Sequence, residues 1–226
     1  MQNSSLIRWG GLAAIGVGLC SLLYGVLYVA LIVLGPKMSP PESLLTFGSQ
    51  STSLLLGLSG LLGLVATVAF FEKLRAAGEG WARLALWFGM FGALLGGLHG
   101  WSDFVRNPAL ARLYDQSNLA SVADTIIALP SPIDPRGIGT FGLAGLGMLV
   151  LGALIAKTSD LPRNLATVAR IGGVLLLLIF IGTVLWADGY GLAFARYLFL
   201  IPGPVQSIIV GPLFYIWFGL RLQPSA

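Results

Sequence analysis

The hydrophobic positions of this chain form six long runs that are separated by shorter polar segments. Each run has about 20 residues or more, the length that an α-helix needs to cross roughly 30 Å of hydrocarbon. The runs cover residues 9–34, 49–71, 84–105, 137–156, 168–187 and 197–220. They are nearly continuous in Leu, Gly, Ala and Val, whereas the strands of a membrane barrel alternate between polar and apolar residues. The pattern predicts an all-α bundle of six transmembrane helices that forms one domain over residues 1–226.

The segment between the third and fourth runs has a helical pattern of its own. Apolar residues recur there every three or four positions, at Leu119, Val122, Ala123, Ile126 and Ile127. This spacing predicts a short amphipathic helix, which we expect to lie on the membrane surface or to cap the bundle. A mobile lid over a binding site is the alternative.

Prolines mark both ends of this segment. Asn107-Pro108 is typical of a helix N-cap followed by proline at the first helical position, so we expect the third span to end before it. Pro130, Pro132 and Pro135 predict an extended approach to the fourth span, because a residue before proline avoids the helical region.

Small residues in the third run identify a packing face. Gly92, Gly96 and Gly100 recur every fourth residue, and Gly89, Ala93 and Gly97 form a parallel row. In lipid, such rows let helix backbones approach closely and gain dispersion contacts. We therefore expect the third span to be a central helix, with a contact between copies of the chain as the alternative.

Composition supports the membrane assignment and limits the partners. Of the 226 residues, 56% are hydrophobic and only 10% are charged, and the mean hydropathy is +0.88. The net charge of +4 comes from basic residues that lie between the apolar runs, not in one patch, so the lipid bilayer is the expected partner and nucleic acid is excluded. Cys20 is the one cysteine, which excludes a disulfide or a thiolate metal cage within the chain.

The basic residues also predict an orientation. Lys and Arg number eight on one side of the membrane and five on the other when the six spans are threaded in order. The eight are Arg8, Lys73, Arg75, Arg83, Lys157, Arg163, Arg170 and Arg221; the five are Lys37, Arg106, Arg112, Arg136 and Arg196. Since cytoplasmic loops carry the excess of Lys and Arg, we expect both termini in the cytoplasm and the protein in the cell inner (plasma) membrane.

One group of polar residues is a candidate ligand-binding site. His99, Asp103 and Arg106 follow one another at helical spacing on the third span, beside the glycine row. Polar residues within a span are costly unless they are paired or face a cavity, so they suggest a site by default. Because His99 lies close to the outer surface, a structural or interfacial role is the alternative.

The sixth run is interrupted near the same side of the membrane. Pro202-Gly203-Pro204 and Gly211-Pro212 each remove backbone donors, which predicts a kinked helix with Gln206 between the breaks. Broken helices at membrane depth often line transporter sites. We therefore add Gln206 to the candidate site, which we expect to open to the outer side.

Enzyme signatures do not fit the chain. Gly57-Leu58-Ser59-Gly60 is similar to the serine motif of rhomboid proteases, but there the histidine lies two helices later and His99 follows in the next helix. A single histidine excludes bis-histidine haem ligation within one chain. No P-loop or dinucleotide fingerprint is present. We expect no enzymatic activity, no catalytic residues, no metal and no cofactor.

The chain resembles uncharacterised bacterial inner-membrane proteins with six spans, a class defined by a domain of unknown function. The resemblance rests on Arg8-Trp9-Gly10-Gly11-Leu12, on Leu161-Pro162-Arg163 and on the closing residues 211–221. It implies a multi-pass membrane protein and brings no substrate or catalytic residue. Two function classes remain: a small-molecule transporter or sensor with an outward-facing polar pocket, and an accessory subunit of a larger membrane complex.

Overall fold

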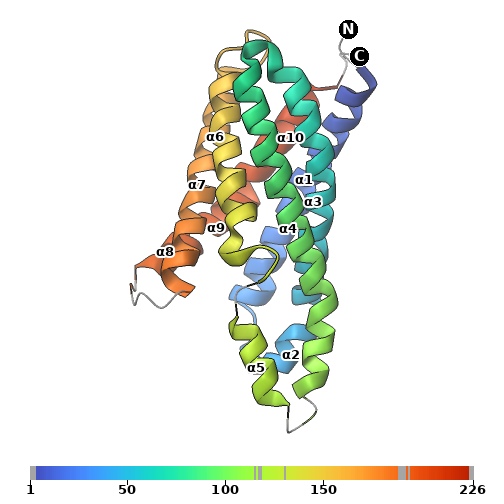
Figure 1. Ribbon diagram of the computed structural model, residues 1–226, viewed down its shortest axis with the longest axis vertical. Helices are drawn as coiled ribbons and strands as arrows, with labels where there is room; N and C mark the ends of the chain where they lie inside the picture. Colours follow the sequence, from blue (N-terminus) through green and yellow to red (C-terminus); the bar gives the residue numbers. More distant parts are fainter. Residues whose placement is uncertain are drawn as a thin grey trace.

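The computed structural model describes residues 4–114, 116, 119–129, 131–187, 192 and 194–223. This part of the chain is helical and contains no strand. Six of its helical stretches are long and apolar enough to cross a membrane, which confirms the predicted fold class. Figure 1 shows them running up and down along the long axis of the molecule.

Each membrane-spanning stretch corresponds to one predicted apolar run. The first span is α1 (Ser4–Leu27) with the π-helix η1 (Tyr28–Val33), and the second is α3 (Phe47–Leu74) with η2 (Arg75–Ala77). The third is α4 (Glu79–Tyr114); the fourth is η3 (Pro135–Gly137), η4 (Ile138–Leu143) and α6 (Ala144–Ile155). The fifth is α7 (Arg163–Ala187), and the sixth is α8 (Ala195–Leu200), α9 (Pro202–Pro204), η5 (Val205–Val210) and α10 (Gly211–Arg221). Two short helices, α2 (Pro40–Leu45) and α5 (Ala120–Ala128), lie in the connections.

The six spans close into a ring in their sequence order. α1 packs against α3, α3 against α4, α4 against α6, α6 against α7, and α7 against the elements of the sixth span. The ring closes because α10 and η5 pack against α1. The first and last spans are therefore neighbours, and both ends of the chain lie at one end of the bundle, at the top of Figure 1. We call this the inner end, and the opposite end the outer end.

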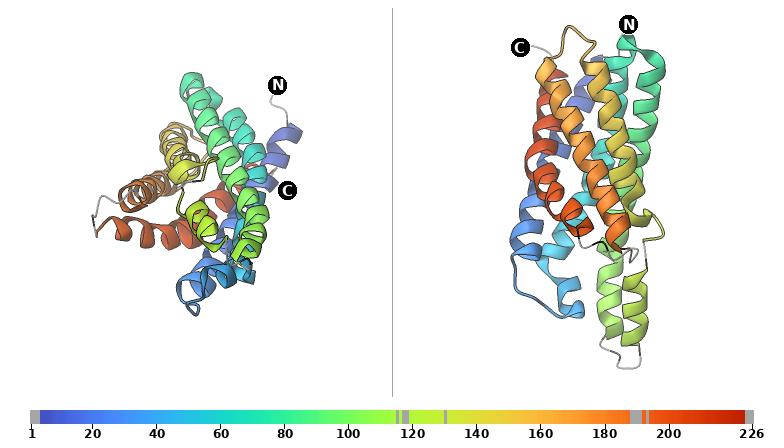
Figure 2. Two further views of the ribbon diagram at one scale, coloured as in Figure 1. Left: turned by 60° about the horizontal axis from the view of Figure 1, so that its bottom comes forward. Right: turned by 90° about the vertical axis from the view of Figure 1, so that its left-hand side faces the viewer.

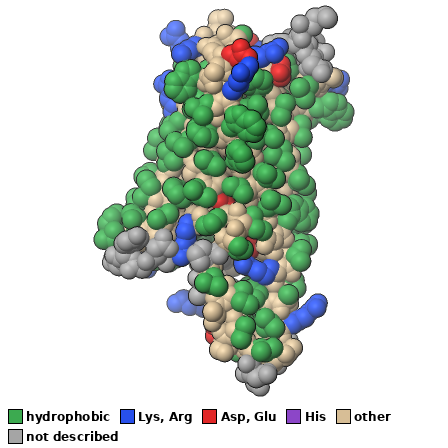
Figure 3. Space-filling view, viewed as in Figure 1, with side chains coloured by type: hydrophobic (Ala, Val, Ile, Leu, Met, Phe, Trp, Pro, Cys, Tyr) green, Lys and Arg blue, Asp and Glu red, His purple; other side chains and the backbone are tan. Residues whose placement is uncertain are grey.

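The third span is a member of this ring, so the expectation that it is a central helix is wrong. One side of α4 faces outward: Trp87, Phe91, Leu94 and Leu98 are between 42% and 60% exposed. Hydrophobic side chains cover the middle of the face drawn in Figure 3, while Lys and Arg gather towards its ends. Each span in such a ring presents one apolar side to lipid.

The glycine rows of α4 nevertheless form packing contacts, as predicted. A methyl group added at Gly100 would lie 2.5 Å from the backbone nitrogen of Gly57 in α3. One added at Gly92 would lie 3.0 Å from the Cβ atom of Ala144 in α6. The rows thus hold α4 between its two ring neighbours, where the lack of side chains allows close backbone approach.

The expected helix start at Asn107-Pro108 is wrong. α4 continues through Pro108 to Tyr114 and, at 36 residues, is about 54 Å long. The proline is tolerated because tertiary contacts hold this part of the helix: Leu110 and Ala111 are each 3% exposed, and the amide of Asn107 donates to the Ser49 hydroxyl at 3.3 Å.

The amphipathic helix of the long connection is confirmed as α5. It packs against the last turns of α4, and with them it projects beyond the outer ends of the other spans (Figure 2). α2 packs against α4 as well, and its start is stabilised by a capping box in which the backbone N–H of Ser39 donates to the Glu42 carboxylate at 3.1 Å. Of the proline segment that follows α5, Pro130 lies outside the described residues; Pro135 begins η3.

Candidate functional site

A central cavity of about 210 Å³ lies inside the ring, and all six spans contribute to its wall. From the first span, the wall takes Val17, Cys20, Ser21, Tyr24 and Tyr28. These residues recur every three or four positions, so they form one face of the helix. The other spans contribute mainly glycine, alanine and apolar side chains. The space is therefore mostly apolar with a few polar groups, which is typical of a site for a small molecule.

Aromatic side chains pack beside the inner part of the cavity. Phe70, which lines it, stacks on Phe218 with ring centroids 4.3 Å apart and contacts Phe214 edge-on at 6.0 Å. Phe214 and Phe218 have no exposed surface. These rings pack α3 against α10 on the inner side of the cavity.

Three of the spans are wound as π-helix in their outer halves, and each of these segments reaches the cavity wall. η1 contributes Tyr28, η4 contributes Thr140 and Phe141, and η5 contributes Gln206 and Ser207. In η5, the amide of Gly211 donates to the Gln206 carbonyl, five residues back. π-Helical turns are rare and occur frequently at functional sites.

Gln206 is the predicted site residue that lies on the cavity wall. Gln206 is 8% exposed, and its Oε1 atom is buried without a hydrogen-bond partner. A buried amide oxygen without a partner costs about 1–3 kcal/mol. A donor that reached this oxygen would recover the cost.

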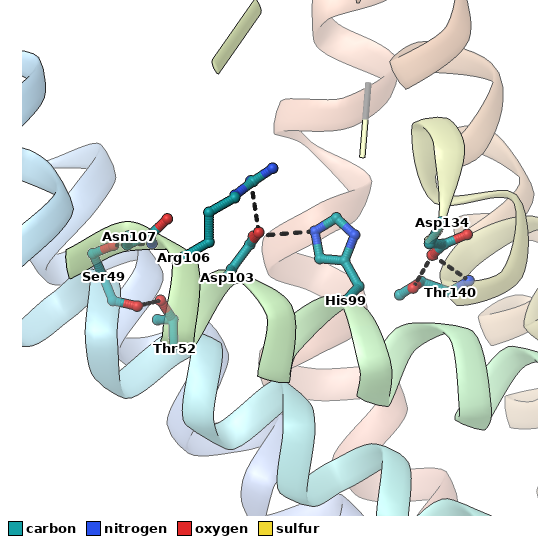
Figure 4. A network of polar contacts seen from close by, with 8 residues as sticks. All are labelled: Ser49, Thr52, His99, Asp103, Arg106, Asn107, Asp134 and Thr140. Carbon is teal, nitrogen blue, oxygen red and sulfur yellow. Dashed lines mark hydrogen bonds and ion pairs between the residues drawn. The ribbon is translucent and has the colours of Figure 1, made fainter. Parts of the chain in front are cut away.

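The other three predicted residues lie together on α4. The His99 Nε2 atom is 3.3 Å from Asp103 Oδ2, and an Arg106 Nη atom donates to Asp103 Oδ1 at 2.8 Å (Figure 4). Their side chains are between 24% and 33% exposed. His99 Nδ1 and Arg106 Nε are buried without partners. The Asp103 carboxylate thus contacts both basic side chains, and each of these has one buried nitrogen without a hydrogen-bond partner.

These three residues do not form part of the cavity wall. Gly96, one turn before His99, does line the cavity, so the three lie just beyond its edge on α4. The site in which His99, Asp103 and Arg106 act together with Gln206 therefore stays a prediction. The structure places only Gln206 on the cavity itself.

Sequence reasoning missed Asp134, which is buried at the outer start of the fourth span and is 1% exposed. Its carboxylate accepts hydrogen bonds from the backbone nitrogen of Thr140 at 3.1 Å and from the Thr140 hydroxyl (Figure 4). It also accepts one from the backbone nitrogen of Gly139 at 2.7 Å. It thereby binds donors that the start of a helix leaves unpaired. The available signal was the pair Asp134-Pro135, an acid followed by proline at the first helical position.

Comparisons with protein families, characterised proteins and solved structures found no match to the chain. Within the described residues, no three His, Cys, Asp or Glu side chains are grouped so that they could hold a metal ion. The site is therefore interpreted from its own geometry.

Proposed function

We propose that this chain is a non-enzymatic integral membrane protein that binds a small, mostly apolar molecule in its central cavity. The observation that carries the proposal is Gln206, a residue of the otherwise largely apolar wall whose amide oxygen is buried without a hydrogen-bond partner. Apolar pockets with a few well-placed polar groups are the usual form of small-molecule sites. We place the protein in a bacterial inner membrane with both termini in the cytoplasm, as the distribution of basic residues favours.

The size of the cavity supports a ligand of modest size. An apolar cavity of about 150 Å³ is enough to bind benzene. At about 210 Å³, this cavity accommodates a benzene ring with a short side chain. Such a molecule partitions into the bilayer, so it reaches the protein from the lipid as readily as from water.

Transport or sensing of that molecule is the function class that we favour over an accessory subunit. The supporting observation is the group of His99, Asp103 and Arg106, whose partly exposed side chains lie beyond the cavity edge with two nitrogens unpartnered. A polar group of this kind in the outer half of a span is typical of a solute pathway. An accessory subunit needs only an outer surface that fits a partner.

Cys20 allows a direct test, because it is the single cysteine of the chain and lines the cavity. The purified protein in detergent is treated with methyl methanethiosulfonate in the presence and absence of 2-phenylethanol. At about ten times its Kd, this probe fills about nine in ten cavities, so modification of Cys20 should slow about tenfold.

The matched control moves the thiol by one residue. In the double variant Cys20→Ala, Leu19→Cys, the thiol replaces a side chain that is 49% exposed on the outer surface of the same helix. The probe should leave its modification rate unchanged. Equal rates with and without probe in the native chain, or equal slowing in both proteins, would contradict binding in the cavity.

A further inference from the structure

The cavity wall carries no charged side chain of its own but lies next to the buried carboxylate of Asp134. None of the residues that line it is Lys, Arg, His, Asp or Glu. Thr140 lines the cavity, and its hydroxyl donates to the buried carboxylate of Asp134. The polarised hydroxyl group therefore connects the wall to a negative charge in a low-dielectric interior, where such a charge acts strongly.

No cation cancels this charge at contact distance in the part of the chain that is described. None of the ion pairs there includes Asp134. His99 lies across from Asp134 in Figure 4, but its Nε2 atom contacts Asp103. Arg136, two residues along, is only half-buried, so water screens its charge more than that of Asp134.

Besides Thr140, three hydroxyl groups of the wall use their hydrogens inside the protein, whereas no bond from Ser59, Tyr24, Tyr28 or Tyr215 is among the contacts described. Ser21 donates to the carbonyl of Ser207 at 3.1 Å, and Ser207 donates to the carbonyl of Gly203 at 2.9 Å. Thr67 donates to the carbonyl of Gly63 at 2.8 Å. A hydroxyl has one hydrogen and two lone pairs. These three groups can therefore still accept a hydrogen bond but have no hydrogen left to donate.

Two further features favour a ligand that donates hydrogens and carries positive charge. The Gln206 Oε1 atom is a buried acceptor without a partner. Tyr24 and Tyr28 line the cavity with their rings stacked, at a centroid distance of 5.9 Å and an interplanar angle of 9°. Aromatic faces attract cations, most strongly where water is excluded.

We propose that the ligand of the central cavity is a protonated hydrophobic amine. Its ammonium group donates to Gln206 Oε1 and lies in the negative field that Thr140 transmits from Asp134, and the aromatic and apolar wall covers its hydrocarbon part. This inference rests on the proposed cavity function and adds the charge of the ligand to it.

Three probes with the same ring and nearly the same chain separate charge from shape. At pH 7, 2-phenylethylamine is a cation, 2-phenylethanol is neutral and phenylacetate is an anion. Their affinities are measured by calorimetric titration of the full chain in detergent, with protein-free micelles as the blank. We expect the amine to bind about tenfold more tightly than the alcohol, which is about 1.4 kcal/mol, and phenylacetate to bind most weakly.

Variants then assign the preference to residues. Asp134→Asn should reduce amine binding to the level of the alcohol and leave alcohol binding unchanged. Gln206→Leu should weaken both probes by a similar factor. Thr140→Ser keeps the hydroxyl and should retain the preference for the amine.

The outcomes distinguish the two proposals. If the alcohol binds and the amine binds no more tightly, the cation preference is wrong and the cavity function stands. If phenylacetate binds most tightly, the inferred sign of the field is wrong. If no probe binds the wild-type protein, the cavity function fails together with the inference. The wild-type series decides the question even if Asp134→Asn does not fold.

Discussion

Gly60 of α3 faces Gly97 of α4 so closely that a methyl group added at Gly60 would lie 2.3 Å from the Cα atom of Gly97. The contact joins two spans through backbone atoms, which leaves no flexible side chain that could move aside. Both residues also line the central cavity. The crossing of α3 and α4 therefore sets the width of the cavity as well as the distance between the two helices.

Replacing Gly60 by Val should lower the free energy of unfolding in detergent by about 1–3 kcal/mol, because α3 and α4 must separate to admit the side chain. Gly80 gives the matched control: it is also helical, but a methyl group there would contact nothing within 4 Å. Gly80→Ala should be neutral or stabilise by up to about 1 kcal/mol through helix propensity. Equal losses of unfolding free energy in the two variants would show that the Gly60–Gly97 contact does not limit the packing of α3 against α4.

Asp134→Ala should destabilise the protein by about 1–2 kcal/mol, because the amides of Gly139 and Thr140 lose their acceptor at the start of the fourth span. Thermal unfolding in detergent measures the effect. Asp124→Ala is the control, since Asp124 lies on the exposed helix α5 and bonds only the Tyr114 hydroxyl among the contacts described. A smaller loss at Asp134 than at Asp124 would speak against the capping role.

The hydrogen bond from Lys73 holds the pKa of Asp160 below its usual value, although partial burial opposes the shift. A lowered pKa in the folded state stabilises the fold above the unfolded pKa of about 3.9, and this contribution is lost as the pH falls through the folded pKa. Since the Asp160 side chain is 56% exposed, water screens the pair and a few tenths of a kcal/mol is the expected size. In a carbon NMR titration, Lys73→Met should raise the pKa of Asp160. No change would show that the two groups are not paired in solution.

Both termini should lie in the cytoplasm. Alkaline phosphatase fused after Arg221 should be inactive in a bacterial host, and a fluorescent protein at the same position should be bright. Phosphatase inserted between α4 and α5, at the outer end of the bundle, serves as the positive control and should be active. The reverse pattern would invert the orientation that the eight-to-five distribution of basic residues predicts.

The number and approximate limits of the spans were predictable, because each must present about 20 apolar residues to lipid. The same composition does not specify which spans touch. The ring order of α1, α3, α4, α6, α7 and α10, and the cavity inside it, arise from backbone contacts such as Gly60–Gly97. Glycines at helical spacing predict that a helix packs closely but not against which neighbour.

The candidate site was predictable in part. Gln206 was predicted because Pro204 and Pro212, on either side of it, indicate an irregular helix. His99 was predicted because a lone polar residue in a span is costly. The π-helical turns gave no signal, since a shift of one hydrogen-bond position leaves the composition unchanged. Pro108 was misinterpreted because proline at the first position of a helix and proline inside a helix that neighbouring elements support have the same local sequence.

The closure of the ring has a consequence for chain connectivity. α1 and α10 are neighbours, and the turn between α3 and α4 lies at the same end of the bundle as the two termini (Figure 1). A circular permutant that links the C-terminus to the N-terminus and begins at α4 would keep the direction of every span across the membrane. The six helices would then be synthesised in the order α4, α6, α7, α10, α1, α3. The architecture is thus a closed cycle of six spans, in which the chain could begin at α4 as well as at α1.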